Sequence, residues 1–231
     1  MTAGPTAVPG GDGRLRCGWA VSSADYERYH DEEWGRPVRG EPALFERLSL
    51  EAFQSGLSWI TILRKRDAFR EAFRGFVPRT VAAFGSDDVE RLMTDARLVR
   101  NRRKIEATIA NARALLALPA GSTLGSLLEE HRAPGAPVPF SLEDVPAITP
   151  GSTALARTLK GAGFRFVGPT TAYAMLQACG YVNDHLRDCW VRPEVERELD
   201  RGPAGSPDTV TDTGPGTGTG STVGAGPHPI A

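Results

Sequence analysis

Helical periodicity dominates this sequence and limits what the chain can fold into. In PALFERLSLEAFQSG (42–56) and SWITILRKRDAFREAFRGF (58–76), apolar residues recur at spacings of three and four, with charged residues between them. No stretch alternates apolar and polar residues in the way of a half-buried strand. The pattern therefore predicts an all-α fold of roughly nine or ten helices, with no internal repeat.

Residues typical of helix ends mark four further helices. These are expected in SDDVERLMTDA (86–96), NRRKIEATIANARALLAL (101–118), PGSTALARTLKGAG (150–163) and PTTAYAMLQACG (169–180). Ser86 is a good N-cap and is followed by acidic residues. Pro119 should stop the second of these helices, and Pro169 should open the last one.

The composition predicts one ordered body between two disordered ends. The chain has 231 residues, of which 40% are hydrophobic, enough to bury one substantial core over residues 14–201. Residues 1–13 consist mainly of Gly, Pro and small residues, and residues 202–231 have almost no large apolar side chains. We expect both ends to be disordered, because they cannot offset the entropy of ordering.

The sequence also bears on the cellular environment. No run of about 18 apolar residues is present, so no membrane span is expected. The first residues lack the charged start and apolar stretch of a signal peptide. Three cysteines are too few for a disulfide scaffold, which favours a reducing cytoplasm with thiols that are free or bound to metal.

Charge alone does not identify a partner. The formal net charge is −1, although LRKRDAFR (63–70) and RLVRNRRK (97–104) are locally basic. Such clusters are most often solvated faces of helices. The overall balance is too neutral to predict nucleic-acid binding by itself.

Two pairs of potential metal ligands lie at opposite ends of the predicted body. Cys17 and His30 are thirteen residues apart, and His185 and Cys189 are four apart, which would place the second pair on one face, or at the entry, of a helix beginning near Leu186. Two cysteines and two histidines can form a closed tetrahedral zinc site. The spacing matches no common zinc finger, however, and a single histidine or cysteine is more often simply packed in a core.

The segment GAGFRFVGPTTAYAML (161–176) predicts a helix–hairpin–helix. A tight turn containing Gly168 separates a helix over 150–161 from one that begins Pro-Thr-Thr-Ala. Backbone N–H groups in such a turn can hold a DNA phosphate without any side-chain charge. An ordinary connection between two helices is an equally good interpretation of this stretch alone.

Taken together, these segments resemble the bacterial 3-methyladenine DNA glycosylase I family, a zinc-containing branch of the helix–hairpin–helix glycosylases. The resemblance rests on RCGWAVSSADYERYHDEEWGRPV (16–38), LFERLSLEAFQSGLSWITILRKR (44–66), DVERLM (88–93), GFRFVGPTTAYAMLQACGYVNDH (163–185) and Cys189. These segments span nearly the whole predicted body. The stretches GLSWITIL and QACGYVNDH are the most specific.

The resemblance implies a fold, an activity and a set of ligands. It implies a structural zinc ion, one per chain, held by Cys17, His30, His185 and Cys189. It also implies a monomeric enzyme that acts on double-stranded DNA containing N3-methylated adenine. The backbone of that DNA would be held at the hairpin by Phe166, Val167, Gly168 and Thr170.

Site roles for removing the base also follow from the resemblance. Methylation at N3 gives adenine a positive charge and weakens its glycosidic bond, so the enzyme needs mainly to extrude the nucleotide and hold the departing base. Such a pocket needs a carboxylate and aromatic faces for a cationic ring. The resemblance assigns the carboxylate to Glu51, and the sequence offers four aromatic residues: Tyr26, Tyr29, Trp34 and Trp59. The alternative interpretation is that the aromatic residues pack in the core and that Glu51 lies on a solvated face of a helix.

Three departures from related patterns refine the expected chemistry. Asn183 stands where the wider superfamily carries a catalytic aspartate. Thr170 replaces the hairpin lysine of members that also cut the strand, so no Schiff-base nucleophile is expected there. The family pattern Leu-Glu-Gly-x-Gln-Ala-Gly reads LEAFQSG here, and Ala52 and Ser55 could alter the range of accepted bases.

Two other classes of function compete with this interpretation. One is a zinc-stapled DNA-binding module without catalysis, for which the loss of Glu51 or Trp59 would be the sign. The other is a zinc hydrolase, which needs an open coordination position. Glu51 and Trp59 are present, and four protein ligands leave no open position.

Overall fold

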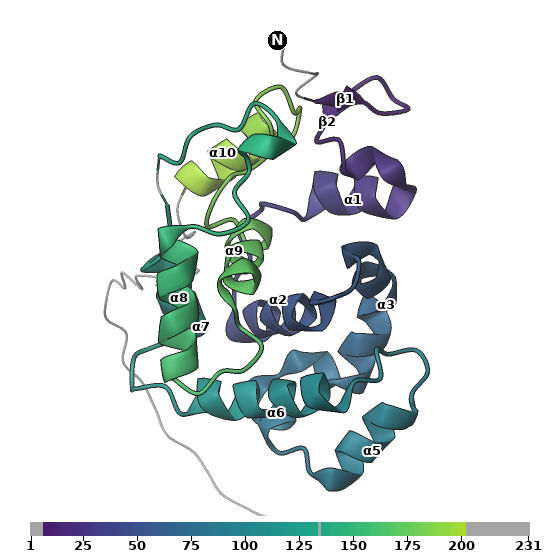
Figure 1. Ribbon diagram of the computed structural model, residues 1–231, viewed down its shortest axis with the longest axis vertical. Coiled ribbons are helices and arrows are strands. Elements are labelled where there is room, and N and C mark those ends of the chain that lie inside the picture. Colours follow the sequence, from purple (N-terminus) through teal and green to yellow (C-terminus); the bar gives the residue numbers. More distant parts are fainter. Residues whose placement is uncertain (1–6, 134, 202–231) are drawn as a thin grey trace, which may run out of the picture. The chain divides into compact units, whose positions relative to one another are not determined.

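Helices account for nearly all of the regular structure in the computed structural model, which describes residues 7–133 and 135–201 (Figure 1). The α-helices are α1 (Ala24–Glu32), α2 (Glu41–Gln54), α3 (Trp59–Ala72), α4 (Pro78–Ala82), α5 (Ser86–Thr94), α6 (Arg102–Leu116), α7 (Leu124–Glu129), α8 (Pro150–Gly161), α9 (Pro169–Ala178) and α10 (Arg192–Asp200). Short 3-10 turns form η1 (Ala20–Ser22), η2 (Arg74–Phe76) and η3 (Leu142–Asp144). Ten α-helices in the described ranges confirm the predicted all-α class.

Helix α2 lies at the centre of the fold (Figure 1). It packs against α3, α6, α7 and α9. Most of its residues are buried, including Ser49, whose hydroxyl donates to the Phe45 carbonyl at 2.7 Å. A helix with neighbours on several sides needs more than one apolar face, which explains why its sequence is apolar over so much of its surface. Glu51 enters the interior because it lies on this helix.

A row of phenylalanine rings fills the core between α2, α3 and η2. The ring centroids of Phe53 and Phe69 are 4.6 Å apart, those of Phe69 and Phe73 are 6.1 Å apart, and those of Phe73 and Phe76 are 5.2 Å apart. All four side chains are fully buried. Burying each ring stabilises the fold by about 1.5–3 kcal/mol, so this row anchors α2 against α3.

Two helix ends differ from the sequence prediction. Gly85, not Ser86, is the N-cap of α5, and its N–H donates to the Asp88 carboxylate at 3.2 Å. The Asp88 side chain thus satisfies the N–H of the N-cap residue, whereas the Ser86 hydroxyl donates to Asp87 at 3.4 Å and does not cap the helix. Helix α6 ends at Leu116, before Pro119 is reached.

The chain also contains a small β-hairpin that the sequence pattern did not predict. Strands β1 (Val8–Pro9) and β2 (Leu15–Arg16) pair antiparallel, so residues 7–13 are not the disordered segment that we expected. The buried Arg16 guanidinium binds Asp12 at 2.6 Å and Asp31 at 2.7 Å. Ion pairs to a buried arginine, rather than an apolar pattern, hold this hairpin.

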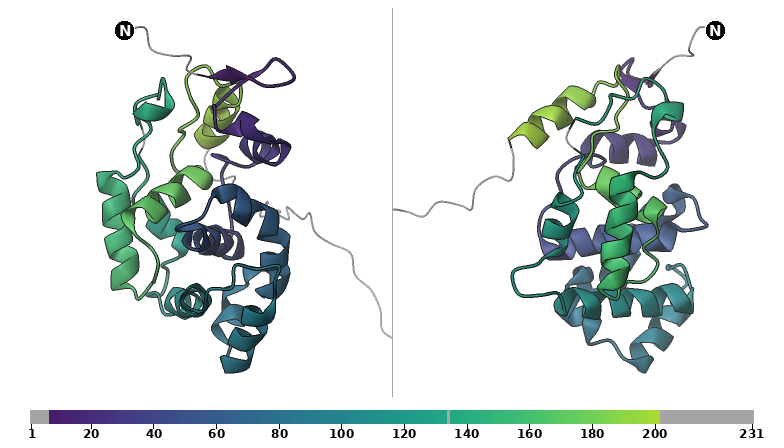
Figure 2. Two further views of the ribbon diagram at one scale, coloured as in Figure 1. Left: turned by 45° about the vertical axis from the view of Figure 1, so that its right-hand side comes forward. Right: turned by 60° about the vertical axis from the view of Figure 1, so that its left-hand side comes forward.

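The predicted pair of helices around residues 162–168 is present. Helices α8 and α9 pack side by side and are joined by a tight turn (Figure 2). Gly163 has φ +94° and Phe166 has φ +56°, so the turn uses the left-handed region twice. Glycine adopts this conformation freely, whereas it strains the phenylalanine.

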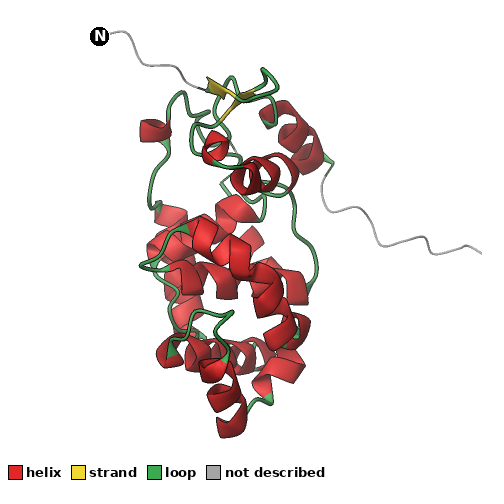
Figure 3. Cartoon of the chain, turned by 90° about the vertical axis from the view of Figure 1, so that its right-hand side faces the viewer, coloured by secondary structure: helices red, strands yellow, loops and turns green. Residues whose placement is uncertain are grey.

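Figure 3 shows how little of the described chain is strand. Apart from η3, residues 135–149 and 179–191 contain no helix or strand. No helix in the described ranges is long and apolar enough to cross a membrane. Residues 202–231, which we expected to be disordered, lie outside the described residues, as do residues 1–6.

Candidate functional site

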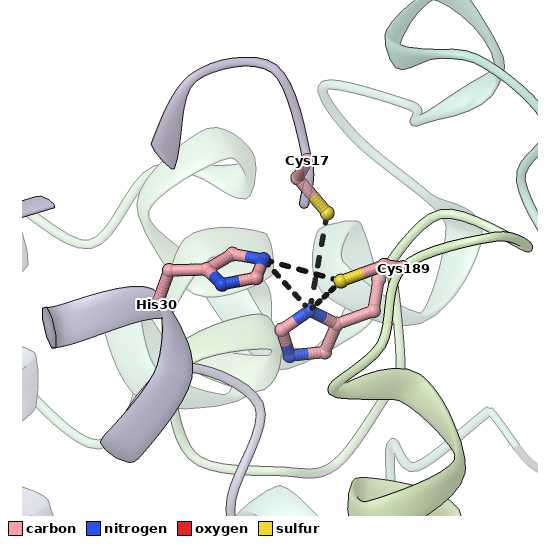
Figure 4. Close-up of side chains that lie close together, drawn as sticks. Cys17, His30 and Cys189 are labelled. Atoms are coloured by element: carbon pink, nitrogen blue, oxygen red, sulfur yellow. Dashed lines mark hydrogen bonds between the residues drawn. The ribbon is translucent and has the colours of Figure 1, made fainter. Parts of the chain in front are cut away.

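Four sulfur and nitrogen ligands from distant parts of the chain meet at one buried point (Figure 4). Cys17 follows β2, and His30 lies in the last turn of α1. His185 and Cys189 lie between α9 and α10. The structure thus brings together the four residues that the sequence singled out, and all four are buried.

The backbone around His185 and Cys189 differs from the expected helix. Residues 181–191 form turns, and α10 begins only at Arg192. The Cys189 N–H donates to the Leu186 carbonyl at 2.9 Å, and the Arg192 guanidinium donates to the His185 carbonyl at 2.5 Å. Individual contacts of this kind, and not a helical turn, bring the two ligands together.

Four of the six pairs of ligand atoms lie 3.2–3.8 Å apart, near the spacing of a tetrahedral ion, and all four atoms lie within 4.8 Å of one another. His30 Nε2 and His185 Nδ1 are 3.2 Å apart, and Cys189 Sγ lies 3.4 Å and 3.6 Å from them. Cys17 Sγ lies 3.8 Å from His185 Nδ1. A tetrahedral zinc ion with ordinary bond lengths separates two nitrogens by about 3.3 Å and a nitrogen from a sulfur by about 3.5 Å. The cluster can therefore hold a metal ion in a closed, four-coordinate site.

Hydrogen bonds fix which ring nitrogen faces the centre. His30 Nδ1 lies 2.8 Å from the Asp31 carboxylate, and His185 Nε2 lies 3.0 Å from the Trp34 carbonyl. Both outer nitrogens must carry the proton, which leaves His30 Nε2 and His185 Nδ1 with free lone pairs. Burial lowers the pKa of His185, which favours the neutral ring that a ligand must be.

A cavity of about 610 Å³ lies beside this centre. Its lining residues are Trp19, Ser22, Tyr26, Tyr29, Trp34, Glu51, Gln54, Trp59, Leu142, Val145, Pro146, Ala147, Thr170, Tyr173, Ala174, Gln177 and Asp184. All five residues that we expected in a base pocket are among them. The Trp34 ring also lies 4.6 Å from the His185 ring, so the cavity and the ligand cluster share a wall.

Glu51 is the most unusual group in the cavity. Its side chain is 6% exposed, yet no hydrogen bond within the described residues reaches its carboxylate. Burial raises the pKa of Glu51 to about 7, against the opposing positive charge of Arg47. A buried carboxylate without a protein donor is costly, and it is suited to a ligand that brings donors or positive charge.

Aromatic rings form one side of the cavity. The centroids of Trp59 and Tyr29 are 5.4 Å apart, and the Tyr26 hydroxyl accepts from the Ile60 N–H at 3.0 Å. This hydrogen bond ties α1 to the first turn of α3, where Trp59 lies. Trp59 Nε1 is buried and has no hydrogen-bond partner within the described residues.

The structure adds a polar wall that the sequence analysis missed. Asp184 Oδ2 accepts from the Tyr173 hydroxyl at 2.6 Å and from Gln177 Nε2 at 2.8 Å. All three line the cavity, as does Trp19. The available signals were the four-residue spacing of Tyr173 and Gln177, which places them on one face of α9, and the position of Asp184 directly before a ligand histidine.

Asn183, which the resemblance placed at the position of a superfamily aspartate, is not among the residues that line the cavity. Its side-chain oxygen accepts from the His185 N–H at 3.2 Å, and its amide donates to the Arg192 carbonyl at 3.3 Å. Asn183 thus shapes the turn that carries the ligands. The carboxylate facing the cavity from this segment belongs to Asp184.

The turn between α8 and α9 reaches the cavity through Thr170, which lines it. Phe166 is 41% exposed, whereas Val167 is fully buried, its backbone included. Gly168 is the N-cap of α9. The buried Asn111 of α6 holds the turn: it donates to the Arg165 carbonyl at 3.0 Å and accepts from the Arg165 N–H at 2.7 Å.

The two departures from the family pattern around Glu51 lie off the cavity. Ala52 is buried on α2, and Ser55 is the C-cap of the same helix. Neither side chain lines the cavity. Their structural effect is on the packing and the end of α2.

Comparison with curated proteins shows close relatives. The chain is 44% identical over 183 residues to a DNA-3-methyladenine glycosylase 1 of Escherichia coli, covering 77% of this chain and 97% of that protein. It is 42% identical over 178 residues to a DNA-3-methyladenine glycosylase of Haemophilus influenzae, covering 75% and 96%.

Solved structures give the same result. A crystal structure of a 3-methyladenine DNA glycosylase I superposes with a TM-score of 0.73 at 44% identity, over 76% of this chain and 98% of that one. The Staphylococcus aureus enzyme, solved in a study of 3-methyladenine recognition, superposes with a TM-score of 0.71 at 36% identity, over 77% and 96%. The family model for methyladenine glycosylases matches residues 19–192. This chain therefore belongs to the methyladenine glycosylase family.

Proposed function

We propose that this protein is a base-excision repair glycosylase that flips out and hydrolytically removes 3-methyladenine from alkylated DNA, leaving an abasic site. Its relatives carry that activity in their names. The observation that carries the proposal is the buried Glu51 carboxylate, which has no hydrogen bond within the described residues and faces an aromatic cavity.

The proposed reaction breaks the bond between N9 of the base and C1′ of the sugar. The methylated base is already cationic, so it leaves as a neutral molecule and takes the bonding electron pair with it. Water adds to C1′ and releases one proton. The protein has to extrude the nucleotide, hold the cationic base and keep it in the pocket while this bond breaks.

Each pocket residue has a role in this proposal. Glu51 accepts hydrogen bonds from the amine edge of the base and favours its positive charge. Tyr29 and Trp59 stack on or line the ring, because a cationic base interacts well with aromatic faces. Tyr26 holds the first turn of α3, and Trp34 closes the side next to the metal centre.

The hairpin supplies the proposed contact with DNA. Backbone groups of Phe166 and Gly168, together with Thr170, would hold a phosphate of double-stranded DNA at the N-terminus of α9, and the fully buried Val167 would support them from inside. Thr170 lines the cavity and follows the turn directly, so this contact would place the extruded nucleotide at the cavity. Asn111 fixes the turn from behind.

The proposed metal is one structural Zn²⁺ per chain. Two sulfur and two nitrogen ligands with tetrahedral spacing suit zinc, and the closed set leaves no position for substrate or water. When bound, the ion contributes folding free energy rather than chemistry on the base. His30 and His185 are already held in the required orientation by Asp31 and by the Trp34 carbonyl.

We further propose that the enzyme has no lyase activity. A lyase needs an amine that attacks C1′, and Thr170 stands where such enzymes carry their hairpin lysine. Incubation with alkylated duplex and borohydride should therefore trap no covalent complex. A trapped adduct in the hairpin would contradict this assignment.

The experiment that tests the proposed function is a base-release assay. Purified protein is incubated with alkylated duplex DNA, and the released bases are identified by chromatography. Release of 3-methyladenine supports the proposal. DNA binding without release would favour the alternative, a zinc-stapled DNA-binding module without catalysis. We expect the active species to be a monomer in the cytoplasm, where its DNA substrate lies, and size-exclusion chromatography tests the first point.

A further inference from the structure

Arg47 lies one helical turn before Glu51 on α2, so their side chains emerge from the same face of the helix. Both are buried: Arg47 is 8% exposed and Glu51 is 6% exposed. The Arg47 guanidinium also lies 5.8 Å from the ring centroid of Tyr29, which lines the cavity with Glu51. A permanent positive charge therefore sits behind the wall of the base pocket.

The charge of Arg47 is only partly neutralised. Its Nη2 donates to Glu33 Oε2 at 2.7 Å, but Arg66 binds the same carboxylate at 2.5 Å and 2.8 Å. Two guanidinium groups thus share one carboxylate. Arg47 Nη1 is buried and has no hydrogen-bond partner within the described residues. Such an unpaired donor is rare enough to require a reason.

We propose that Arg47 is a positioning residue whose incompletely neutralised charge keeps the neighbouring Glu51 carboxylate ionised, so that the pocket selects a cationic base at neutral pH. The inference rests on the role proposed for Glu51. In this inference Arg47, which does not line the cavity, sets the charge of the Glu51 carboxylate, which does. Without Arg47, burial alone would favour the uncharged carboxyl, which cannot stabilise a cation.

The other groups around Glu51 are consistent with this division of roles. Tyr29 of α1 and Cys179 after α9 are neutral, because burial raises the pKa of both, that of Cys179 to about 12. Asp184 also lines the cavity, and its carboxylate accepts from Tyr173 and Gln177. Arg47 is the charge that opposes the effect of burial on the pKa of Glu51.

The test is the pH dependence of single-turnover release of 3-methyladenine from alkylated duplex, corrected for spontaneous release. The wild type should lose activity toward acid pH as Glu51 protonates, and this fall forms the acid limb of its pH–rate profile. Arg47→Met, which keeps the bulk but not the charge, should move this acid limb to higher pH by about one unit. Arg47→Lys, the charge-preserving control, should stay near the wild type.

Glu33→Gln provides a second variant with the opposite sign. It removes the negative charge that neutralises Arg47, so its acid limb should move to lower pH. A change that merely loosened the fold would not move the limb in opposite directions in two variants. Glu51→Gln identifies the titrating group, because its acid limb should disappear.

The outcomes separate the two claims. If Glu51→Gln loses the acid limb while folded Arg47→Met and Glu33→Gln keep the limb of the wild type, the inference about Arg47 is overturned and the role of Glu51 stands. If the limb persists in Glu51→Gln, the proposed role of Glu51 fails, and the inference about Arg47 fails with it.

Discussion

Among the residues of the cavity, Glu51 has an environment that stability alone would not favour. A carboxylate on a helix apolar on several sides, without a protein donor within the described residues, destabilises the fold whenever it is charged. Burying the aromatic rings around it, in contrast, stabilises the fold. Glu51 thus lowers the stability of the fold but suits the binding of a charged ligand, as expected for a residue of a functional site.

This cost predicts a pH-dependent gain in stability for Glu51→Gln. Because the pKa of Glu51 rises to about 7 in the fold from a reference value of 4.5, the fold favours the protonated form. The wild type should therefore lose stability as the pH rises from about 4.5 to about 7, by roughly 3 kcal/mol. Glu51→Gln should melt higher than the wild type at pH 8 and equally at pH 4.

The control for this prediction is Glu106→Gln, a change at an exposed glutamate of α6. It should leave the free energy of unfolding within a few tenths of a kcal/mol of the wild type at both pH values. Equal melting of Glu51→Gln and wild type at pH 8 would show that the carboxylate carries no such cost.

The residues of the site differ in how well the sequence could predict them. The four metal ligands and the five expected pocket residues could be singled out because their side-chain types suit metal binding and base binding. In the structure the ligands form one cluster, and the five pocket residues line one cavity. Asp184 was missed because its position in the cavity depends on the turn over residues 181–191, which has no periodicity to read. Asn183, one position earlier, forms hydrogen bonds that shape the turn itself.

At the scale of elements, the hairpin between α8 and α9 depends on a helix far away in the sequence. Asn111 of α6 bridges both backbone groups of Arg165, next to the strained Phe166. A turn with a non-glycine residue in the left-handed region needs such support to keep one conformation. Helix α6 therefore sets the shape of the proposed DNA contact.

Asn111→Leu tests this dependence. It removes two hydrogen bonds to the backbone N–H and carbonyl of the exposed Arg165, at a cost of about 0.5–1.5 kcal/mol each. We expect duplex DNA affinity to fall about tenfold, measured by fluorescence anisotropy. Thr108→Val, also buried on α6, is the matched control and should bind DNA normally. Unchanged DNA affinity in Asn111→Leu would show that the hydrogen bonds of Asn111 to the turn do not matter for DNA binding.

Helices with a long periodic pattern or clear end signals could be predicted from the sequence, and the other short elements could not. The period-3.6 patterns of α2, α3 and α6 are long enough to be unambiguous. Helix α5 has 9 residues and was expected from its N-terminal signals, whereas α1, α4, α7 and α10 were not specified individually. The hairpin of β1 and β2 is held by ion pairs from Arg16 to Asp12, four residues earlier, and to Asp31 of α1, and neither pair produces an apolar pattern in the sequence.

At the scale of the whole described region, the metal cluster joins the beginning and the end of the fold. It connects the segment of Cys17 and His30 to the turn of His185 and Cys189, which are more than 150 residues away. The entropy lost on closing a loop grows only slowly with its length. The binding free energy of the ion, in contrast, stabilises the folded chain in full. The N-terminal hairpin and α10 should therefore depend on the metal more than the phenylalanine core does.

Cys189→Ser and His30→Ala should each lower the melting temperature and abolish stoichiometric zinc, measured by elemental analysis. Cys179→Ser is the matched control, because Cys179 is equally buried but lies outside the cluster. It should lose some stability and keep one zinc ion per chain. Purified wild type without stoichiometric zinc would contradict the assignment of the metal, and full zinc content in Cys189→Ser would exclude that ligand.

The central claim is that Glu51 reads the methylated base in this cavity, and single-turnover release of 3-methyladenine by wild type and Glu51→Ala tests it most directly. Losing a charge-assisted hydrogen bond in a buried pocket costs about 1.5–3 kcal/mol, or about tenfold to a few hundredfold in rate. Glu51→Ala should show that loss with zinc content unchanged and no loss of thermal stability, and Glu51→Gln should lose less. Release by Glu51→Ala at the rate of the wild type, or a loss explained by unfolding, would contradict the account.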